Sequence, residues 1–108
     1  MLDLNELCKM AYENTCKRAK HEPEIKTGTM EALKHCAGEV VEATEAFIRY
    51  DNHKTGINET CLAGELADII CCVLTICGKE NIDIEYALVR CMEKNAIRAE
   101  RGKQDETC

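Results

Sequence analysis

Several kinds of residue are scarce in this sequence, and each scarcity excludes certain structures or functions. Its 108 residues include no tryptophan, one proline, six glycines and only 4% aromatic residues. Proline and glycine are the strongest helix breakers, so a chain with so few of them can form long, uninterrupted helices. No run of about 18 apolar residues occurs, so the sequence predicts no membrane-spanning segment and no membrane partner.

Basic residues are also in the minority. The chain has 14 lysines and arginines against 20 aspartates and glutamates, which gives a formal net charge of -6. Because an acidic surface repels the phosphate backbone, we expect no nucleic acid partner. The first residues, LDLNELCKM, are acidic and lack an apolar run, so no secretory signal peptide is predicted.

Cysteine is abundant, but its usual patterns are missing. The nine cysteines are irregularly spaced, and no CxxC pair occurs. Paired metal-binding cysteines and a disulfide framework both call for regular spacings. We therefore interpret the cysteines as reduced, small apolar residues of a cytoplasmic protein, in preference to zinc ligands.

Apolar residues recur with a helical period in four segments, and no segment alternates with a period of two. The sequence therefore predicts an all-α, four-helix bundle-like subunit made of a single domain, residues 1–108. Asp83 is a suitable N-cap for the last helix, and Asn81 is suited to end a turn. YDNHKTGIN, residues 50–58, is predicted to be a loop, and the tail GKQDETC is predicted to be frayed. The predicted helices are residues 4–20, 30–49, 59–78 and 84–101.

The four predicted helices differ in how clearly their helical period indicates a core-facing side, and two of them give a defined row. The helix over 59–78 is the most apolar and is predicted to be central. The first helix has a weak apolar stripe, so we expect another chain to complete the core. The predicted stripe of the second helix is Leu33, Cys36, Val40, Ala43 and Phe47. The predicted inward row of the last helix is Ile84, Leu88, Cys91 and Asn95.

Two pairs of acids lie beside these apolar stripes. Glu39 and Glu42 follow AG in the second helix, and Glu65 and Asp68 follow AG in the third. Acids three residues apart are neighbours on a helix and repel each other unless a cation lies between them. Hard cations such as Mg²⁺ prefer carboxylate oxygens. A solvated helix face would explain a single pair, whereas two matching pairs favour a metal site of four carboxylates.

A glycine precedes the first acid of each pair. Gly38 and Gly64 each lie inside a predicted helix, where glycine costs about 1 kcal/mol relative to alanine. The same placement in both helices predicts either a close approach of another helix or room for a ligand.

The ExxE and ExxD pairs, the apolar run IICCVLTIC and the last-helix sequence EKNAIR resemble the all-α, MazG-like nucleoside triphosphate pyrophosphohydrolases. The resemblance extends from about Leu33 to Arg101. It implies that Glu39, Glu42, Glu65 and Asp68 are catalytic residues that bind Mg²⁺, with Mn²⁺ as a possible substitute. It also implies hydrolysis of a nucleoside triphosphate, with ribose or deoxyribose, to the monophosphate and pyrophosphate. A homodimer or homotetramer and a role in nucleotide-pool housecleaning are further implications.

The same resemblance predicts substrate contacts on the last helix. Asn95 and Arg98 continue its inward row, and Lys94 lies beside them. Arginine offers a bidentate fork for phosphate oxygens, so Arg98 is suited to this contact. Many members of the family carry a lysine where this chain has Cys91, so Arg90 or Lys94 is the alternative phosphate contact. A basic helix C-terminus that interacts with the helix dipole is the alternative interpretation of Lys94.

Aromatic side chains that could stack on a nucleobase are few. Tyr12, Phe47 and Tyr50 are the candidates, although the position of Phe47 in the apolar stripe favours a core role. His35 lies one turn before Glu39 and could help to bind a phosphate or base, but an ordinary polar helix position is the simpler interpretation.

Two other functions compete with hydrolysis. A di-iron or di-manganese helical bundle usually carries Glu-x-x-His motifs, which neither His35 nor His53 completes. A non-catalytic helical module, which binds a metal, a nucleotide or a basic protein through its acids, is the principal alternative. Stabilisation by Mg²⁺ would separate a metal site from an acidic interaction surface.

Overall fold

The computed structural model describes residues 3–53 and 57–101, except for the side chains of 50–53 and 57–61. These residues form four helices, α1 (Leu4–His21), α2 (Thr29–His53), α3 (Ile57–Glu80) and α4 (Ile84–Arg101), and no strand. The all-α prediction is confirmed, and each predicted helix lies within a helix of the structure. Among the described helices, none is both long and apolar enough to cross a membrane. The tail GKQDETC lies outside the described residues.

The connection between α2 and α3 is shorter than predicted. Helical backbone continues to His53 and resumes at Ile57, so the predicted loop over residues 50–58 is wrong for the six of these residues that the structure describes. The physical reason is that polarity does not end a helix. Charged and polar residues are tolerated on an exposed helical surface, and only glycine and proline break it strongly.

Polar contacts fix the junction where α4 begins. Asn81 has a φ of 55°, in the left-handed region that ends a helix, and Asp83 caps α4 by accepting a hydrogen bond from the Tyr86 N–H at 3.1 Å. Asn5 of α1 donates from Nδ2 to Asp83 Oδ1 at 3.0 Å and accepts from the Ile84 N–H at 3.1 Å. Both predicted turn residues are confirmed, and the cap also joins α4 to α1.

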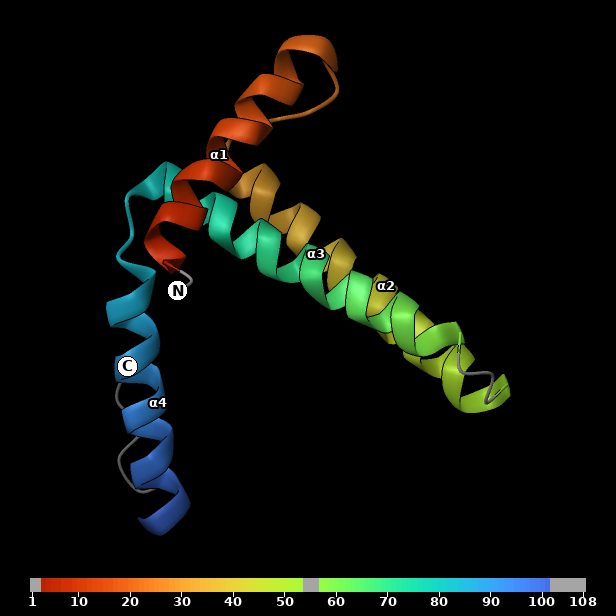
Figure 1. Ribbon diagram of the computed structural model, residues 1–108, viewed down its shortest axis with the longest axis vertical. Helices are drawn as coiled ribbons and strands as arrows, with labels where there is room; N and C mark the ends of the chain where they lie inside the picture. Colours follow the sequence, from red (N-terminus) through yellow and green to blue (C-terminus); the bar gives the residue numbers. More distant parts are fainter. Residues whose placement is uncertain (1–2, 54–56, 102–108) are drawn as a thin grey trace.

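α2 and α3 lie side by side as an antiparallel hairpin (Figure 1). α1 packs against the end of this hairpin where α3 finishes, and α4 leaves from the same end. α4 then diverges from the hairpin, and among the described residues its main packing partner is α1. α3 contacts both α1 and α2, which confirms the prediction that the most apolar helix is central.

The buried core of one chain is small. Cys8 of α1 packs with Leu74 and Cys77 of α3. Gly78 permits this contact, because any Cβ there would collide with the Cys8 carbonyl group. On α2, Ala43 and Ala46 are buried. These five side chains are the buried apolar residues of the described chain, so most of the apolar surface of the long helices remains outside the core.

Two predicted core stripes are only partly confirmed. In α2, Ala43 is buried and Cys36 half-buried, but Leu33, Val40 and Phe47 are each about half exposed. In α4, Ile84 packs against the core, whereas the remainder of the predicted inward row, Leu88, Cys91 and Asn95, is exposed. The predictions fail in part because α4 diverges from the hairpin, so none of the described elements covers the exposed residues of either stripe.

Candidate functional site

The α2–α3 hairpin brings three of the four predicted acids together. Glu39 and Glu42 come from α2 and Glu65 comes from α3, and one carboxylate oxygen of each lies within 4.8 Å of the others. The antiparallel pairing explains the meeting, because the two acid-bearing rows lie on the same face of the hairpin. Among the described residues, this is the only group of three or more potential metal ligands whose ligand atoms lie that close together.

Two oxygens of this group are buried and have no hydrogen-bond partner among the residues that the structure describes. They are Oε2 of Glu39 and Oε2 of Glu65. The Glu39 side chain is only 13% exposed, and its other oxygen, Oε1, lies 3.0 Å from His35 Nε2. A buried carboxylate oxygen without a partner is costly, because it has lost its water without gaining a hydrogen bond. Hard, unpartnered oxygens from separate helices fit the ligand preference of Mg²⁺.

The carboxylates of the group repel one another. Burial raises the pKa of Glu39, and the neighbouring Glu42 and Asp68 raise it further, against a smaller opposing effect of His35. Burial likewise raises the pKa of Glu65, with added repulsion from Glu42 and Asp68. Each glutamate therefore carries its negative charge less easily than a free glutamate does. A cation at this place would relieve that repulsion.

The fourth predicted acid, Asp68, lies beside the group and not within it. Its charge acts on both Glu39 and Glu65, yet it is not among the oxygens that meet within 4.8 Å. Asp68 is exposed, and it lines a cavity that Glu39 also lines. The structure thus separates three clustered glutamates from one aspartate at the edge of an adjoining cavity.

This cavity has a volume of about 510 Å³ and lies among α1, the following segment, α2 and α3. Its size falls within the range of small-molecule sites, which is roughly 300–1,000 Å³. Its walls carry hydroxyl, thiol, carboxylate and cationic groups together with two apolar side chains, Ile25 and Ala32. A ligand held at the clustered glutamates would have this space next to it.

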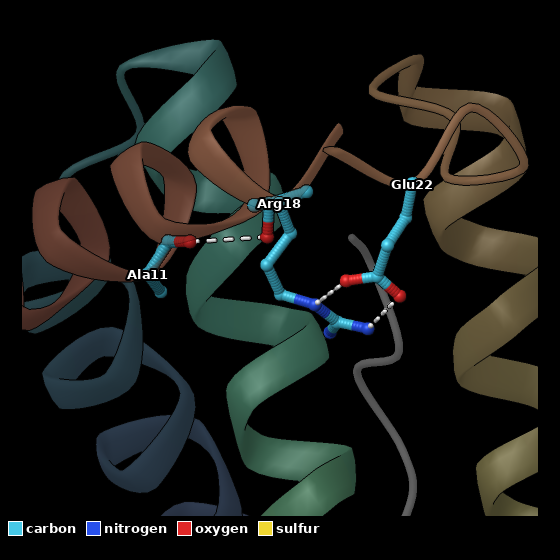
Figure 2. Close-up of polar contacts among 4 residues, drawn as sticks. Ala11, Arg18 and Glu22 are labelled. Atoms are coloured by element: carbon cyan, nitrogen blue, oxygen red, sulfur yellow. Dashed lines mark hydrogen bonds and ion pairs between the residues drawn. The ribbon is translucent and has the colours of Figure 1, made fainter. Parts of the chain in front are cut away.

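Two cations in the cavity wall were missed by sequence reasoning. Arg18 lies near the end of α1, and Lys26 lies in the segment that follows. Figure 2 shows the Arg18 guanidinium facing the Glu22 carboxylate, with Nε 3.2 Å from Oε2 and a terminal nitrogen 3.4 Å from Oε1. These residues were missed because the apolar stripe of the first helix is weak. The sequence therefore did not indicate which side of α1, or which part of the following segment, lies next to the acids.

The predicted substrate contacts on α4 are not brought to the acids within one chain. Lys94 and Arg98 are half-buried, and Asn95 is exposed and donates toward Cys91 Sγ at 3.8 Å. The cavity next to the acids is lined by α1, α2, α3 and the segment between α1 and α2. α4 diverges from that region (Figure 1). Arg90 of the same helix lies over the Tyr86 ring, 5.9 Å from its centre.

The remaining candidates fall in three different places. His35 lines the cavity and contacts Glu39, which gives it a position beside the acids. Phe47 is exposed in α2, so the expected core role is not seen within one chain. Tyr12 is half-buried in α1, and Gly78 of α3 approaches it. The side chains of Tyr50 and His53 lie outside the described residues.

The two glycines before the acids are not explained by packing within the chain. A Cβ added at Gly38 or at Gly64 would meet no described residue within 4 Å. The expected close approach of another helix is therefore wrong for the single chain. Open space beside both acids agrees with the other expectation, which was room for a ligand.

Comparisons with known proteins and structures found no match for this chain. No family model matches the chain, no curated protein matches it, and no solved structure matches it.

Proposed function

We propose that this protein is a Mg²⁺-dependent nucleoside triphosphate pyrophosphohydrolase of the MazG-like type, with a four-helix bundle-like subunit. The observation that carries the proposal is the meeting of Glu39, Glu42 and Glu65 within 4.8 Å, with two buried oxygens that accept no hydrogen bond from any described residue. The matching AGExxE and AGExxD sequences supply these acids from both helices of the hairpin. The proposed reaction yields a nucleoside monophosphate and pyrophosphate.

The clustered glutamates fit a divalent cation. Glu39, Glu42 and Glu65 would hold Mg²⁺, or Mn²⁺ in its place, through hard oxygen ligands that otherwise repel one another. A bound Mg²⁺ supplies polarisation of phosphoryl oxygens and lowers the pKa of a coordinated water. His35 contacts Glu39 through Oε1, at 3.0 Å, and would help to hold this carboxylate in place.

Asp68 is the acid that we assign to proton transfer. It lies outside the tight group, is exposed and lines the cavity, so its carboxylate is available to a water molecule there. Asp68 would accept the proton of that water as its oxygen attacks phosphorus. The P–O bond between the monophosphate and the pyrophosphate group breaks, and pyrophosphate leaves with the bridging oxygen.

The cations of the cavity wall would contact the substrate's phosphates. Arg18 and Lys26 line the same cavity as Glu39 and Asp68, so within one chain we assign phosphate contacts to them first. Lys94, Asn95 and Arg98 remain proposed substrate contacts on the strength of the family resemblance. They would require an approach of α4 to an acid face, from this chain or from another copy.

The direct test is substitution of an acid followed by two measurements. Glu42→Gln removes one ligand charge with little change of shape, and Asp68→Asn removes the proposed proton acceptor. We expect both variants to lose Mg²⁺-dependent triphosphate hydrolysis. Glu42→Gln should also lose stabilisation by Mg²⁺, which at 100 times the dissociation constant amounts to about 2.7 kcal/mol in the unmodified protein.

Glu45→Gln is the matched control, because Glu45 is an exposed residue of α2 outside the glutamate group. It should keep both the activity and the Mg²⁺ effect. Full activity in both acid variants would contradict the proposal. If Mg²⁺ stabilises the unmodified protein but no triphosphate is hydrolysed, the protein is the non-catalytic binding module.

A further inference from the structure

The cavity beside the acids extends well beyond them along the hairpin. Glu39 of α2 and Asp68 of α3 line it near the glutamate group, and Ala32 and Thr75 line it seven residues away in each helix. Because α2 and α3 are antiparallel, both walls continue in the same direction, toward the end where α1 packs (Figure 1). A helix rises about 1.5 Å per residue, so the walls extend about 10 Å from the acids. A ligand with its phosphates at the acids would have its remaining part at this far end.

Four half-buried side chains define the far end: Thr15 of α1, Ile25, Ala32 of α2 and Thr75 of α3. Thr15 belongs to it because Ala11, one turn earlier on α1, packs against the core that α3 forms directly beside Thr75. Ile25 belongs to it because its segment joins α1 to the start of α2. Ligand sites combine apolar walls with a few polar groups that fix the orientation of the ligand. The two apolar side chains suit the faces of a flat ring, so the two threonines decide which ring edge fits.

Both threonines use their hydroxyl hydrogens within their own helices. Thr15 Oγ1 donates to the carbonyl oxygen of Ala11 at 3.1 Å (Figure 2). Thr75 Oγ1 donates to the carbonyl oxygen of Cys71 at 2.8 Å. A hydroxyl has one hydrogen and two lone pairs. Each threonine can therefore accept a hydrogen bond from a ligand, but its hydrogen is already engaged.

The charged side chains of the cavity wall strengthen this pattern. Glu24 and Glu31 are next in sequence to residues of the far end, and an ionised carboxylate accepts hydrogen bonds without donating any. The cationic donors in the wall are Arg18, Lys26 and His35. The proposed function places the first two at the phosphates, and His35 contacts Glu39. Acceptors therefore predominate at the far end.

A wall of acceptors distinguishes the nucleobases at one position of the ring. Cytosine and adenine carry an exocyclic amino group there, which donates, whereas thymine and guanine carry a carbonyl, which accepts. Uracil has the same carbonyl as thymine. When a carbonyl lies against another acceptor, both remain without a hydrogen bond, and unpaired polar groups in a half-buried site are costly.

We propose that the far end of the cavity is a nucleobase site that selects cytosine and adenine over uracil, thymine and guanine. Thr15 and Thr75 are the residues that accept hydrogen bonds from the exocyclic amino group. This selection rests on the proposed function, which places the phosphates at the acids and so directs the base to the far end.

The test compares two nucleotides that cannot be cleaved at the proposed position, the α,β-methylene triphosphates of cytidine and uridine. Their dissociation constants are measured by isothermal titration calorimetry with the full chain and Mg²⁺. We expect the cytidine compound to bind about tenfold more tightly, which is the usual effect when a hydrogen bond is replaced by two opposed acceptors. Equal affinities, tighter binding of the uridine compound, or no binding of either would overturn the base site.

Substitution of the threonines tests their role. Thr75→Val keeps the branched shape, removes the acceptor and should bring the two dissociation constants close together. Thr15→Val should do the same from another helix, so the test survives if one variant does not fold. The matched control is Thr44→Val, because Thr44 Oγ1 donates to the Val40 carbonyl at 2.9 Å in the same way but Thr44 is not part of the cavity wall. The control should keep the tenfold preference, and an unchanged preference in both other variants would overturn the proposal.

Turnover enters none of these measurements, so the two proposals can fail separately. Hydrolysis of triphosphates without a preference for the cytidine compound would overturn the base site alone. A clear preference for the cytidine compound in a protein that hydrolyses no triphosphate would overturn the proposed hydrolysis alone.

Discussion

At the scale of single residues, the most informative feature is the raised pKa of Glu39 and Glu65. A carboxyl group whose pKa is raised on folding destabilises the fold whenever it is ionised. Such a cost is typical of a functional site, where charged groups are held for a ligand at the expense of stability. The site can therefore be probed through stability alone, without knowledge of the substrate.

Glu39→Gln should raise the melting temperature of the metal-free protein at neutral pH. The pKa of Glu39 is raised in the folded state, mainly by burial and then by Glu42, so its ionisation at neutral pH opposes folding. The destabilisation is absent below the ordinary glutamate pKa of 4.5, and it grows as the pH rises from there through the folded-state pKa. Thermal unfolding of both proteins should therefore show little difference in melting temperature at pH 4 and a higher melting temperature for Glu39→Gln at pH 7.

The exposed α2 residue Glu45 again supplies the control. Glu45→Gln removes the same charge outside the group and should not reproduce this pH-dependent gain. With added Mg²⁺ the unmodified protein should have the higher melting temperature, because Mg²⁺ stabilises it more than the Glu39→Gln variant. A Glu39→Gln variant that is less stable than the parent at pH 7 without metal would contradict the repulsion described above.

At the scale of helices, the packing of α1 on α3 depends on a single glycine. Gly78→Ala would force a Cβ against the Cys8 carbonyl and the Tyr12 side chain. Overpacking of this kind typically costs about 1–3 kcal/mol. We expect a loss of that size in the free energy of unfolding, measured by urea titration.

Gly64→Ala is the matched change in the same helix. A Cβ there meets nothing within 4 Å, so the helix gains from the better propensity of alanine, by roughly 0.5–1 kcal/mol. The two substitutions are chemically identical and should have opposite signs. Equal effects at both positions would mean that α1 does not pack against α3 at Gly78.

The junction of α1 with α4 should weaken in acid. Hydrogen bonds from the Asn5 side chain and then from the Tyr86 backbone lower the pKa of Asp83 below its usual value of 3.8. A lowered pKa gives stability that is present above 3.8 and is lost as the pH falls through the folded-state value. Asp83→Ala should therefore lower the melting temperature at pH 6 and leave less difference from the parent near pH 2. An equal difference at both pH values would contradict this role.

At the scale of the whole molecule, the sequence predicts the elements better than their assembly. Four helices, the cap at Asp83 and the turn at Asn81 follow from local patterns, and the structure confirms them. The exposure of Leu33, Val40 and Phe47 could not be predicted, because the helical period indicates which side is apolar but not what covers it. The same limit explains the misplaced inward row of α4.

The candidate site was likewise predictable only in part. The pairing of Glu39 and Glu42 with Glu65 was predictable, because matching spacings on adjacent antiparallel helices meet on one face. Asp68 lies outside the tight group because of the conformations of the side chains, which cannot be predicted from the spacing of the acids in the sequence. Arg18 and Lys26 could not be predicted either, since their place in the cavity wall depends on how α1 crosses α3.

Product analysis by chromatography is the decisive measurement for the proposed hydrolysis. The protein is incubated with ribo- and deoxyribonucleoside triphosphates and Mg²⁺, beside its Glu42→Gln and Glu45→Gln variants. We expect a monophosphate and pyrophosphate, without a diphosphate, from the unmodified protein and from Glu45→Gln, and no product from Glu42→Gln. A diphosphate product, no product from any triphosphate, or full activity in Glu42→Gln would contradict it.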